Sequence, residues 1–176
     1  MATFNESLAY GQVGESLIAR WLRKREYWVL PVYEKEIDTG KGPRLFLPVG
    51  QLIAPDLIAL KPATGAAFWI EAKHKSAFTW HRLTEQWVTG IDLRHYADYL
   101  RICDQSPWPI WLLFLQRAGQ AKDSPAGCPT GLYGGDLAFL RQHEHHRHDN
   151  WGRGGMVYWA EGDLKKLAHL RDLIPT

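Results

Sequence analysis

Two carboxylates and a lysine stand out in the first half of the chain, because each lies in or next to an apolar segment. Asp56 interrupts one apolar run, and Glu71 ends another, with Lys73 two residues later. Side chains two residues apart on a strand share a face, so Glu71 and Lys73 project together while Ala72 turns away. Two carboxylates and an ammonium that converge among apolar neighbours are costly to desolvate without a further partner. A divalent metal with oxygen ligands meets that need, so these residues predict a metal site.

The segment that holds these residues is typical of a β-hairpin. Two apolar arms, at about 50–60 and 66–73, flank the sequence Lys-Pro-Ala-Thr-Gly at 61–65, which has turn chemistry. Pairing of the arms would bring Asp56 alongside Glu71. The predicted metal site therefore depends on this hairpin.

Pro55-Asp56 followed by Glu71-Ala72-Lys73 resembles the motif of the PD-(D/E)XK nuclease superfamily. The resemblance implies an α/β fold with a restriction endonuclease-like αβββαβ core, whose central mixed sheet is flanked by helices. It also implies metal-dependent hydrolysis of DNA phosphodiesters, with Mg²⁺ as the cofactor and Mn²⁺ as a substitute. Asp56, Glu71 and the Ala72 carbonyl would bind the metal. Lys73 would either deprotonate the attacking water or stabilise the developing negative charge, and the sequence does not decide between these roles.

A first helix is expected over residues 5 to about 26, and Glu15 lies on its apolar stripe. From the residues alone, a glutamate at the rim that pairs with Arg20 or Lys24 is the simpler interpretation. The sequence Gly-Gln-Val-Gly-Glu at 11–15 is similar to the first-helix pattern of Holliday junction resolvases. In those enzymes the glutamate contributes to the metal site. The resemblance therefore adds Glu15 to the predicted ligands, directly or through water.

A second helix is predicted over residues 79 to about 102, where Gln86 is a polar member of an apolar stripe. A glutamine near this place often borders the metal site in related nucleases, so the resemblance makes Gln86 a catalytic candidate. A glutamine bonded to backbone at the helix edge is an equally good interpretation. Lys75, His81 and Arg82 would form a basic rim beside the site.

The remaining pattern predicts further strands and an extension after the αβββαβ core. The expected elements are an edge strand at 26–33, a loop or short hairpin at 34–50, a central strand at 110–115, a short helix at 136–142, a strand at 156–159 and a closing helix at 163–173. The extension is therefore a strand followed by a helix. Residues 117–155 otherwise show no clear regular pattern.

Two polar segments have alternative interpretations. Lys35, Lys41 and Arg44 in the 34–50 segment could meet phosphates, although a solvated loop is the more common outcome. The cluster at 143–149 contains four histidines. A zinc site there is the less favoured alternative to a solvated or DNA-facing loop, because the ligand spacing is unconvincing and no cysteine supports it.

The length of 176 residues predicts one domain over 1–176, with the core at about 5–116 and the extension at about 117–176. The net charge of +2 permits nucleic-acid binding without requiring it. Cys103 and Cys128 lack zinc-ligand spacing, so we expect reduced thiols and a cytoplasmic protein. No signal peptide or membrane-length apolar run is evident, so no membrane partner is expected.

These observations predict a metal-dependent endonuclease that acts on DNA. The resemblance to junction resolvases implies a homodimer. One alternative is a nucleic-acid-binding protein on the same fold that does not cleave. The other is an α/β interaction protein in which Asp56, Glu71 and Lys73 form a structural ion-pair network. The first-helix pattern favours a junction-resolving or repair enzyme, while duplex ends, single strands and specific sequences stay open as substrates.

Overall fold

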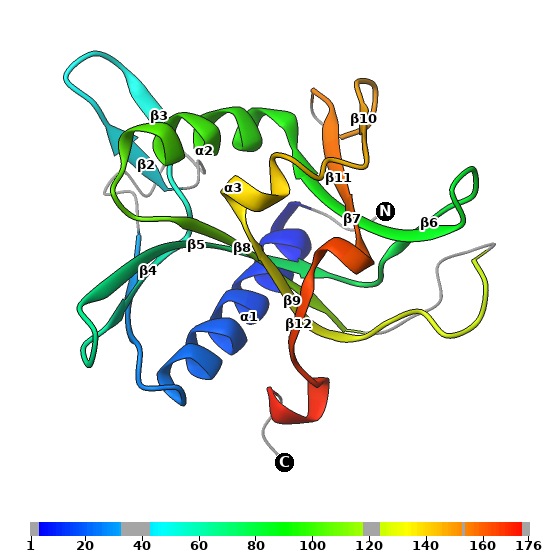
Figure 1. The fold of residues 1–176 in the computed structure, drawn as a ribbon, viewed down its shortest axis with the longest axis horizontal. Coiled ribbons are helices and arrows are strands. Elements are labelled where there is room, and N and C mark those ends of the chain that lie inside the picture. Colours follow the sequence, from blue (N-terminus) through cyan, green and yellow to red (C-terminus); the bar gives the residue numbers. More distant parts are fainter. Residues whose placement is uncertain (1–3, 33–42, 118–123, 153, 174–176) are drawn as a thin grey trace.

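A computed structural model describes residues 4–32, 43–117, 124–152 and 154–173, and it shows a mixed α/β fold (Figure 1). The helices are α1 (Phe4–Arg23), α2 (Leu93–Gln105) and α3 (Leu137–Leu140). The strands of the central sheet are β1 (Trp28–Pro31), β4 (Leu57–Lys61), β5 (Ala66–Lys75), β8 (Ile110–Gln116), β9 (Gly131–Asp136) and β12 (Lys165–Ala168). No helix in these ranges has the length and apolar character needed to cross a membrane.

A second sheet and a hairpin complete the strands. The second sheet contains β6 (Thr79–His81), β7 (Gln86–Asp92), β10 (His146–His148) and β11 (Met156–Ala160), in the order β10-β11-β7-β6. The hairpin consists of β2 (Arg44–Phe46) and β3 (Gln51–Ile53). Short 3-10 turns at Glu161–Asp163 and Leu170–Asp172 flank β12.

The central sheet has the order β1-β4-β5-β8-β9-β12 and is mixed, because β5 and β8 run parallel while the other neighbours are antiparallel. When the β2–β3 hairpin and strands β6 and β7 are set aside, the order α1, β1, β4, β5, α2, β8 confirms the predicted αβββαβ core. The apolar run in β8 places that strand in the middle of the sheet, as expected for a strand covered on both faces. Pro31 lies on the edge strand β1, which is where a residue without an N–H is tolerated.

Two apolar clusters cover the opposite faces of this sheet. On one face, Ile18 and Leu22 of α1 pack with Ile70 of β5, and on the other, Tyr96 and Tyr99 of α2 belong to the cluster that contains Trp69. Alternate residues of β5 therefore face different helices, and α1 and α2 appear on opposite sides of the sheet in Figure 1. This arrangement brings side chains from both helices toward β5.

The prediction of a helix beginning at residue 79 is wrong. Residues 79–81 and 86–92 are strands β6 and β7, and α2 begins only at Leu93. The segment is rich in aromatic and β-branched residues, which favour strands. Moreover, β7 pairs along its length with β11, which lies more than sixty residues later in the chain. That tertiary pairing overrides the apparent helical spacing.

The end of the chain also differs from the expectation. The predicted helix at 163–173 is strand β12 between two 3-10 turns, because this segment pairs antiparallel with β9. Strand β9 itself was not predicted. Its glycines lack the β-branched and aromatic side chains that indicate a strand. At Gly134 the glycine is explained by close packing, because a Cβ there would lie only 2.5 Å from the Leu113 side chain. Strand β11 and helix α3 confirm the predictions for 156–159 and 136–142, and the β2–β3 hairpin confirms the short-hairpin alternative in part. The arm predicted at about 50–60 is not one strand, because Gln51–Ile53 pairs with β2 and only Leu57–Lys61 pairs with β5.

Candidate active site

The candidate site lies where two paired strands separate. Strand β4 pairs with β5 only from Ala66 to Ile70, whereas β8 stays paired with β5 as far as Lys75. The second half of β5 therefore has no β4 partner. Asp56 immediately precedes β4, and its Oδ2 accepts a hydrogen bond of 2.9 Å from the backbone N–H of Ala72. The aspartate side chain thus satisfies a β5 donor that the ladder has left open.

Glu71 is the centre of the cluster and is only 1% exposed. Its Oε1 forms an ion pair with Lys73 Nζ, as expected for two residues on one strand face. Its Oε2 accepts a 2.5 Å hydrogen bond from the Tyr99 hydroxyl of α2. His95, one turn earlier, places Nδ1 at 3.4 Å from the same hydroxyl. Both carboxylate oxygens of Glu71 therefore have partners.

Sequence reasoning missed Tyr99 and His95. The helix predicted over residues 79 to about 102 has its apolar stripe on other residues, so that prediction points to neither side chain. A helix that begins at residue 93 would place Tyr96, Tyr99 and Ile102 at steps of three on one buried face. That spacing is the signal that could have identified Tyr99.

Burial and like charge perturb the acids of the site. The pKa of Asp56 is raised to about 8, because burial and the charges of Glu71 and Glu15 raise it more than Lys73 and the Ala72 N–H lower it. Burial works against the charge of Lys73, but Glu71 and Asp56 outweigh it and raise the pKa of this lysine. In the metal-free protein at neutral pH, the cluster therefore favours a protonated Asp56 beside the Glu71–Lys73 ion pair.

Glu15 projects from α1 toward the same cluster. Its side chain is half-buried, and burial raises its pKa, with Lys73 lowering it and Glu71 raising it. Gly14, the preceding residue, lies against His74 of β5, and a Cβ at this position would overlap the His74 side chain. The glycine therefore allows the helix to approach the strand closely enough for Glu15 to act on Glu71.

The carboxylates of the site are compatible with a small divalent cation, but they do not provide a complete coordination shell. No group of three or more His, Cys, Asp or Glu side chains within the described ranges could hold a metal ion. Mg²⁺, however, is commonly bound by one or two carboxylates, with waters and substrate phosphates completing its shell. Asp56 and Glu71 provide two such carboxylates, and a cation between them would offset the burial and the repulsion from Glu71 that raise the pKa of Asp56.

Gln86 is not brought to this site. It lies exposed at the first position of β7, and its Oε1 is 2.9 Å from His145 Nε2. Asp92, at the other end of β7, is the residue whose charge acts on Lys73. A seven-residue strand is roughly 20 Å long, so Gln86 and the catalytic candidates lie far apart. Its interpretation as a helical residue beside the metal was wrong.

The predicted basic rim is divided between two places. Lys75 ends β5 next to the site, whereas His81 belongs to β6 and Arg82 to the turn that follows it. His81 Nδ1 is 2.8 Å from Thr84 Oγ1. The rim therefore does not form as a unit. Lys35 and Lys41 lie outside the described residues, and Arg44 belongs to β2.

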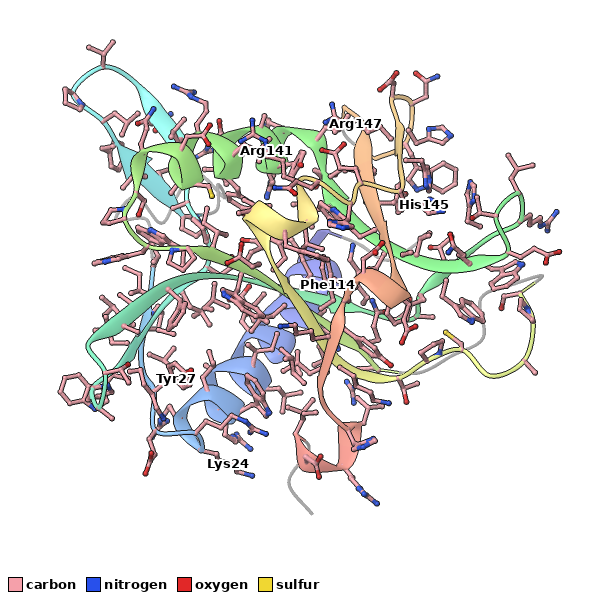
Figure 2. All side chains as sticks on the ribbon, viewed as in Figure 1. Lys24, Tyr27, Phe114, Arg141, His145 and Arg147 are labelled. Carbon is pink, nitrogen blue, oxygen red and sulfur yellow. The ribbon has the colours of Figure 1, made fainter. Side chains whose placement is uncertain are left out.

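The histidine cluster is only partly packed: His145 and His146 are half-buried, whereas His143 and His148 are exposed, as expected for a solvated segment. His145 Nδ1 lies 2.6 Å from His146 Nδ1, and the His146 ring stacks on Tyr158 with centroids 4.6 Å apart. The His81 ring lies 4.5 Å from that of His146. Figure 2 shows His145 and Arg147 near β10 and β11, on the opposite side of the molecule from Lys24 and Tyr27. The zinc alternative gains no support, because these rings do not form a metal-binding group.

Comparisons with known proteins add one structural likeness. No protein-family model matches the sequence, and no curated protein matches it. Among solved structures, the fold is similar to Hjc, a Holliday junction resolvase from the archaeal hyperthermophile Archaeoglobus fulgidus. The identity is 8%, the TM-score is 0.46, and the match covers 84% of this chain and 86% of that one. A likeness at this level carries no argument about activity, so the function is argued from the side chains of this chain.

Proposed function

We propose that this protein is a metal-dependent nuclease that hydrolyses DNA phosphodiester bonds with a PD-(D/E)XK-type site. The observation that supports it is the convergence of the half-buried Asp56 and the fully buried Glu71 beside Lys73, at the point where β4 leaves β5. The αβββαβ order of the core and the motif resemblance support the same proposal. Perturbed titratable groups that converge at one place are typical of functional sites.

The chain's own residues have distinct tasks in this proposal. Asp56, Glu71 and the Ala72 carbonyl would hold the cation, and Glu15 would contribute directly or through water. When bound, a divalent cation polarises the scissile phosphate and lowers the pKa of a coordinated water. Tyr99 fixes the orientation of the Glu71 carboxylate through its hydrogen bond to Oε2.

Lys73 is better suited to electrostatic stabilisation than to accepting a proton. Its pKa is raised by Glu71 and Asp56, so the ammonium form persists at neutral pH in the metal-free protein. A lysine in this state donates hydrogen bonds to the negative charge that develops on the phosphate. We therefore assign Lys73 to stabilising that charge.

A cleavage panel tests the proposal. Supercoiled, linear, single-stranded and four-way-junction DNA are incubated with wild-type protein in Mg²⁺, Mn²⁺ or EDTA. We expect cleavage in either metal, none in EDTA, and none by Asp56→Asn. The first-helix resemblance favours the junction as the best substrate and also predicts a homodimer, which a solution molar-mass measurement checks. Absence of metal-dependent cleavage on every DNA would refute the nuclease proposal.

One structural observation favours a rival. Lys73 and Tyr99 already occupy both oxygens of Glu71, which is what a purely structural ion-pair network requires. In that case Mg²⁺ would leave the melting temperature unchanged. The nuclease proposal predicts that Mg²⁺ raises it, because a ligand that binds the folded state stabilises that state.

A further inference from the structure

Lys75 ends β5 and lies on the same strand face as Glu71 and Lys73. The intervening residue, His74, packs against Gly14 of α1, so the lysines on either side of it project to the opposite face. On that face Gln116, the register partner of Lys75 on β8, donates a 3.0 Å hydrogen bond to Thr89 of β7. Lys75 therefore lies between the catalytic candidates and the second sheet.

The surroundings of Lys75 differ from those of Lys73. Lys73 is ion-paired with Glu71, whereas the Lys75 side chain makes no hydrogen bond or ion pair with a residue in the described ranges. The backbone carbonyl of Lys75 accepts a 3.1 Å hydrogen bond from the N–H of Arg117. The Lys75 side chain is half-buried. The pKa of Lys75 is lowered to about 8, because burial and the charge of Lys73 lower it more than the charges of Asp92 and Glu71 raise it. A partly desolvated ammonium without a counter-ion is costly, and binding an anion offsets that cost.

We propose that Lys75 binds the phosphate next to the one being cleaved, so that the site accepts a polynucleotide backbone and not an isolated phosphate ester. This inference rests on the proposed nuclease function and names the substrate feature that its site requires. On an extended strand, residues two apart are separated by roughly 6.6 Å. Successive phosphates of a nucleic-acid strand have a comparable separation. Two neighbouring phosphates can therefore meet Lys73 and Lys75 together.

The first experiment measures binding without cleavage. Fluorescence anisotropy compares wild type, Lys75→Gln and Lys75→Arg on a labelled oligonucleotide in Ca²⁺. We expect Lys75→Gln to weaken binding about tenfold, as for loss of one charged hydrogen bond, while Lys75→Arg binds within about threefold of wild type. The slope of log affinity against log salt should fall in magnitude by about 0.9 on duplex or about 0.7 on single-stranded DNA. Lys165→Gln, an exposed lysine on β12, is the matched control and should bind as wild type does.

The second experiment locates the contact. The cleavage position is mapped, and the phosphate on each side of it is replaced in turn by a neutral methylphosphonate. On one side, the replacement should weaken wild-type binding about tenfold and leave Lys75→Gln unaffected, because both changes remove the same contact. Inorganic phosphate at millimolar concentration should displace the oligonucleotide from wild type no better than from Lys75→Gln.

The outcomes separate this inference from the proposed function. Suppose that wild type cleaves DNA, but that each methylphosphonate replacement weakens the binding of wild type and of Lys75→Gln equally. The Lys75 contact is then refuted, while the nuclease proposal stands. An unchanged affinity of Lys75→Gln would refute it as well. If wild type cleaves no DNA, the nuclease proposal fails, and the anisotropy measurement still decides whether Lys75 contacts the backbone. If free phosphate displaced the oligonucleotide from wild type better than from Lys75→Gln, Lys75 would belong to a small-anion site instead.

Discussion

The perturbed carboxyl of Asp56 predicts an unusual pH dependence of stability in the metal-free protein. Burial raises its pKa from the ordinary value of 3.8 to about 8. Between these two values the folded protein keeps a proton that the unfolded chain has lost. The free energy of unfolding must therefore fall as the pH rises from about 4 to about 8. For one proton, the slope reaches about 1.4 kcal/mol per pH unit.

The change that isolates this effect is Asp56→Asn. Asparagine has nearly the same shape, and its side-chain oxygen can still accept the hydrogen bond from Ala72 N–H. From pH 5 to pH 7, the free energy of unfolding of wild type should fall by up to about 2.7 kcal/mol relative to that of the variant. For a protein of this size, that corresponds to roughly 5–10 °C in melting temperature. The variant should therefore become relatively more stable as the pH rises.

Denaturant titrations of both proteins in EDTA at pH 5, 6 and 7 provide the measurement. The histidines and the other acids titrate in both proteins, so the difference between the two curves reports Asp56. Addition of Mg²⁺ should reduce the difference at pH 7 more than at pH 5, because the metal competes with the proton. Parallel pH curves for the two proteins in EDTA would refute the argument that Asp56 is buried beside Glu71 in a protonated form.

Three further substitutions test the roles of individual side chains. Tyr99→Phe removes the hydrogen-bond donor to Glu71 Oε2. It should therefore lower metal affinity or cleavage about 10–100-fold and lower the free energy of unfolding by about 1–3 kcal/mol. Unchanged activity would remove Tyr99 from the site. Lys73→Ala should reduce cleavage at least about 100-fold while metal still raises the melting temperature, and near-normal cleavage would contradict its assignment. Glu15→Gln should shrink the metal-dependent rise in melting temperature and slow cleavage, whereas a surface ion-pair role predicts an unchanged metal response. Calorimetric melts and a cleavage time course measure all three.

The local part of the site could be predicted from the sequence because it depends on neighbouring residues. Glu71 and Lys73 share a face in any strand, and the structure pairs them. The turn at 61–65 makes a hairpin probable from local chemistry alone, and the hairpin brings Asp56 to Ala72. Glu15 needed the family resemblance, because its position on an apolar stripe has a simpler explanation.

The parts that could not be predicted depend on distant pairing. Residues 86–92 become a strand through pairing with Met156–Ala160, and no local signal indicates that partner. The error displaced the start of α2, so Tyr99 was missed and Gln86 was misplaced. The histidine packing depends on the same sheet, since His146 meets His81 only after β10, β11, β7 and β6 have aligned. In both cases long-range strand pairing decided the structure, and for residues 86–92 it overrode an apparent helical spacing of the apolar residues.

Cleavage of a labelled four-way junction and a matched duplex by wild type and Glu71→Gln, purified in parallel, tests the central claim most directly. The account predicts that wild type cleaves in Mg²⁺ and not in EDTA. It also predicts that the variant retains a cooperative melting transition and loses at least about 100-fold in rate. Equal cleavage by the two proteins, or wild-type cleavage that persists in EDTA, would contradict a metal-dependent site built on Glu71 and Asp56.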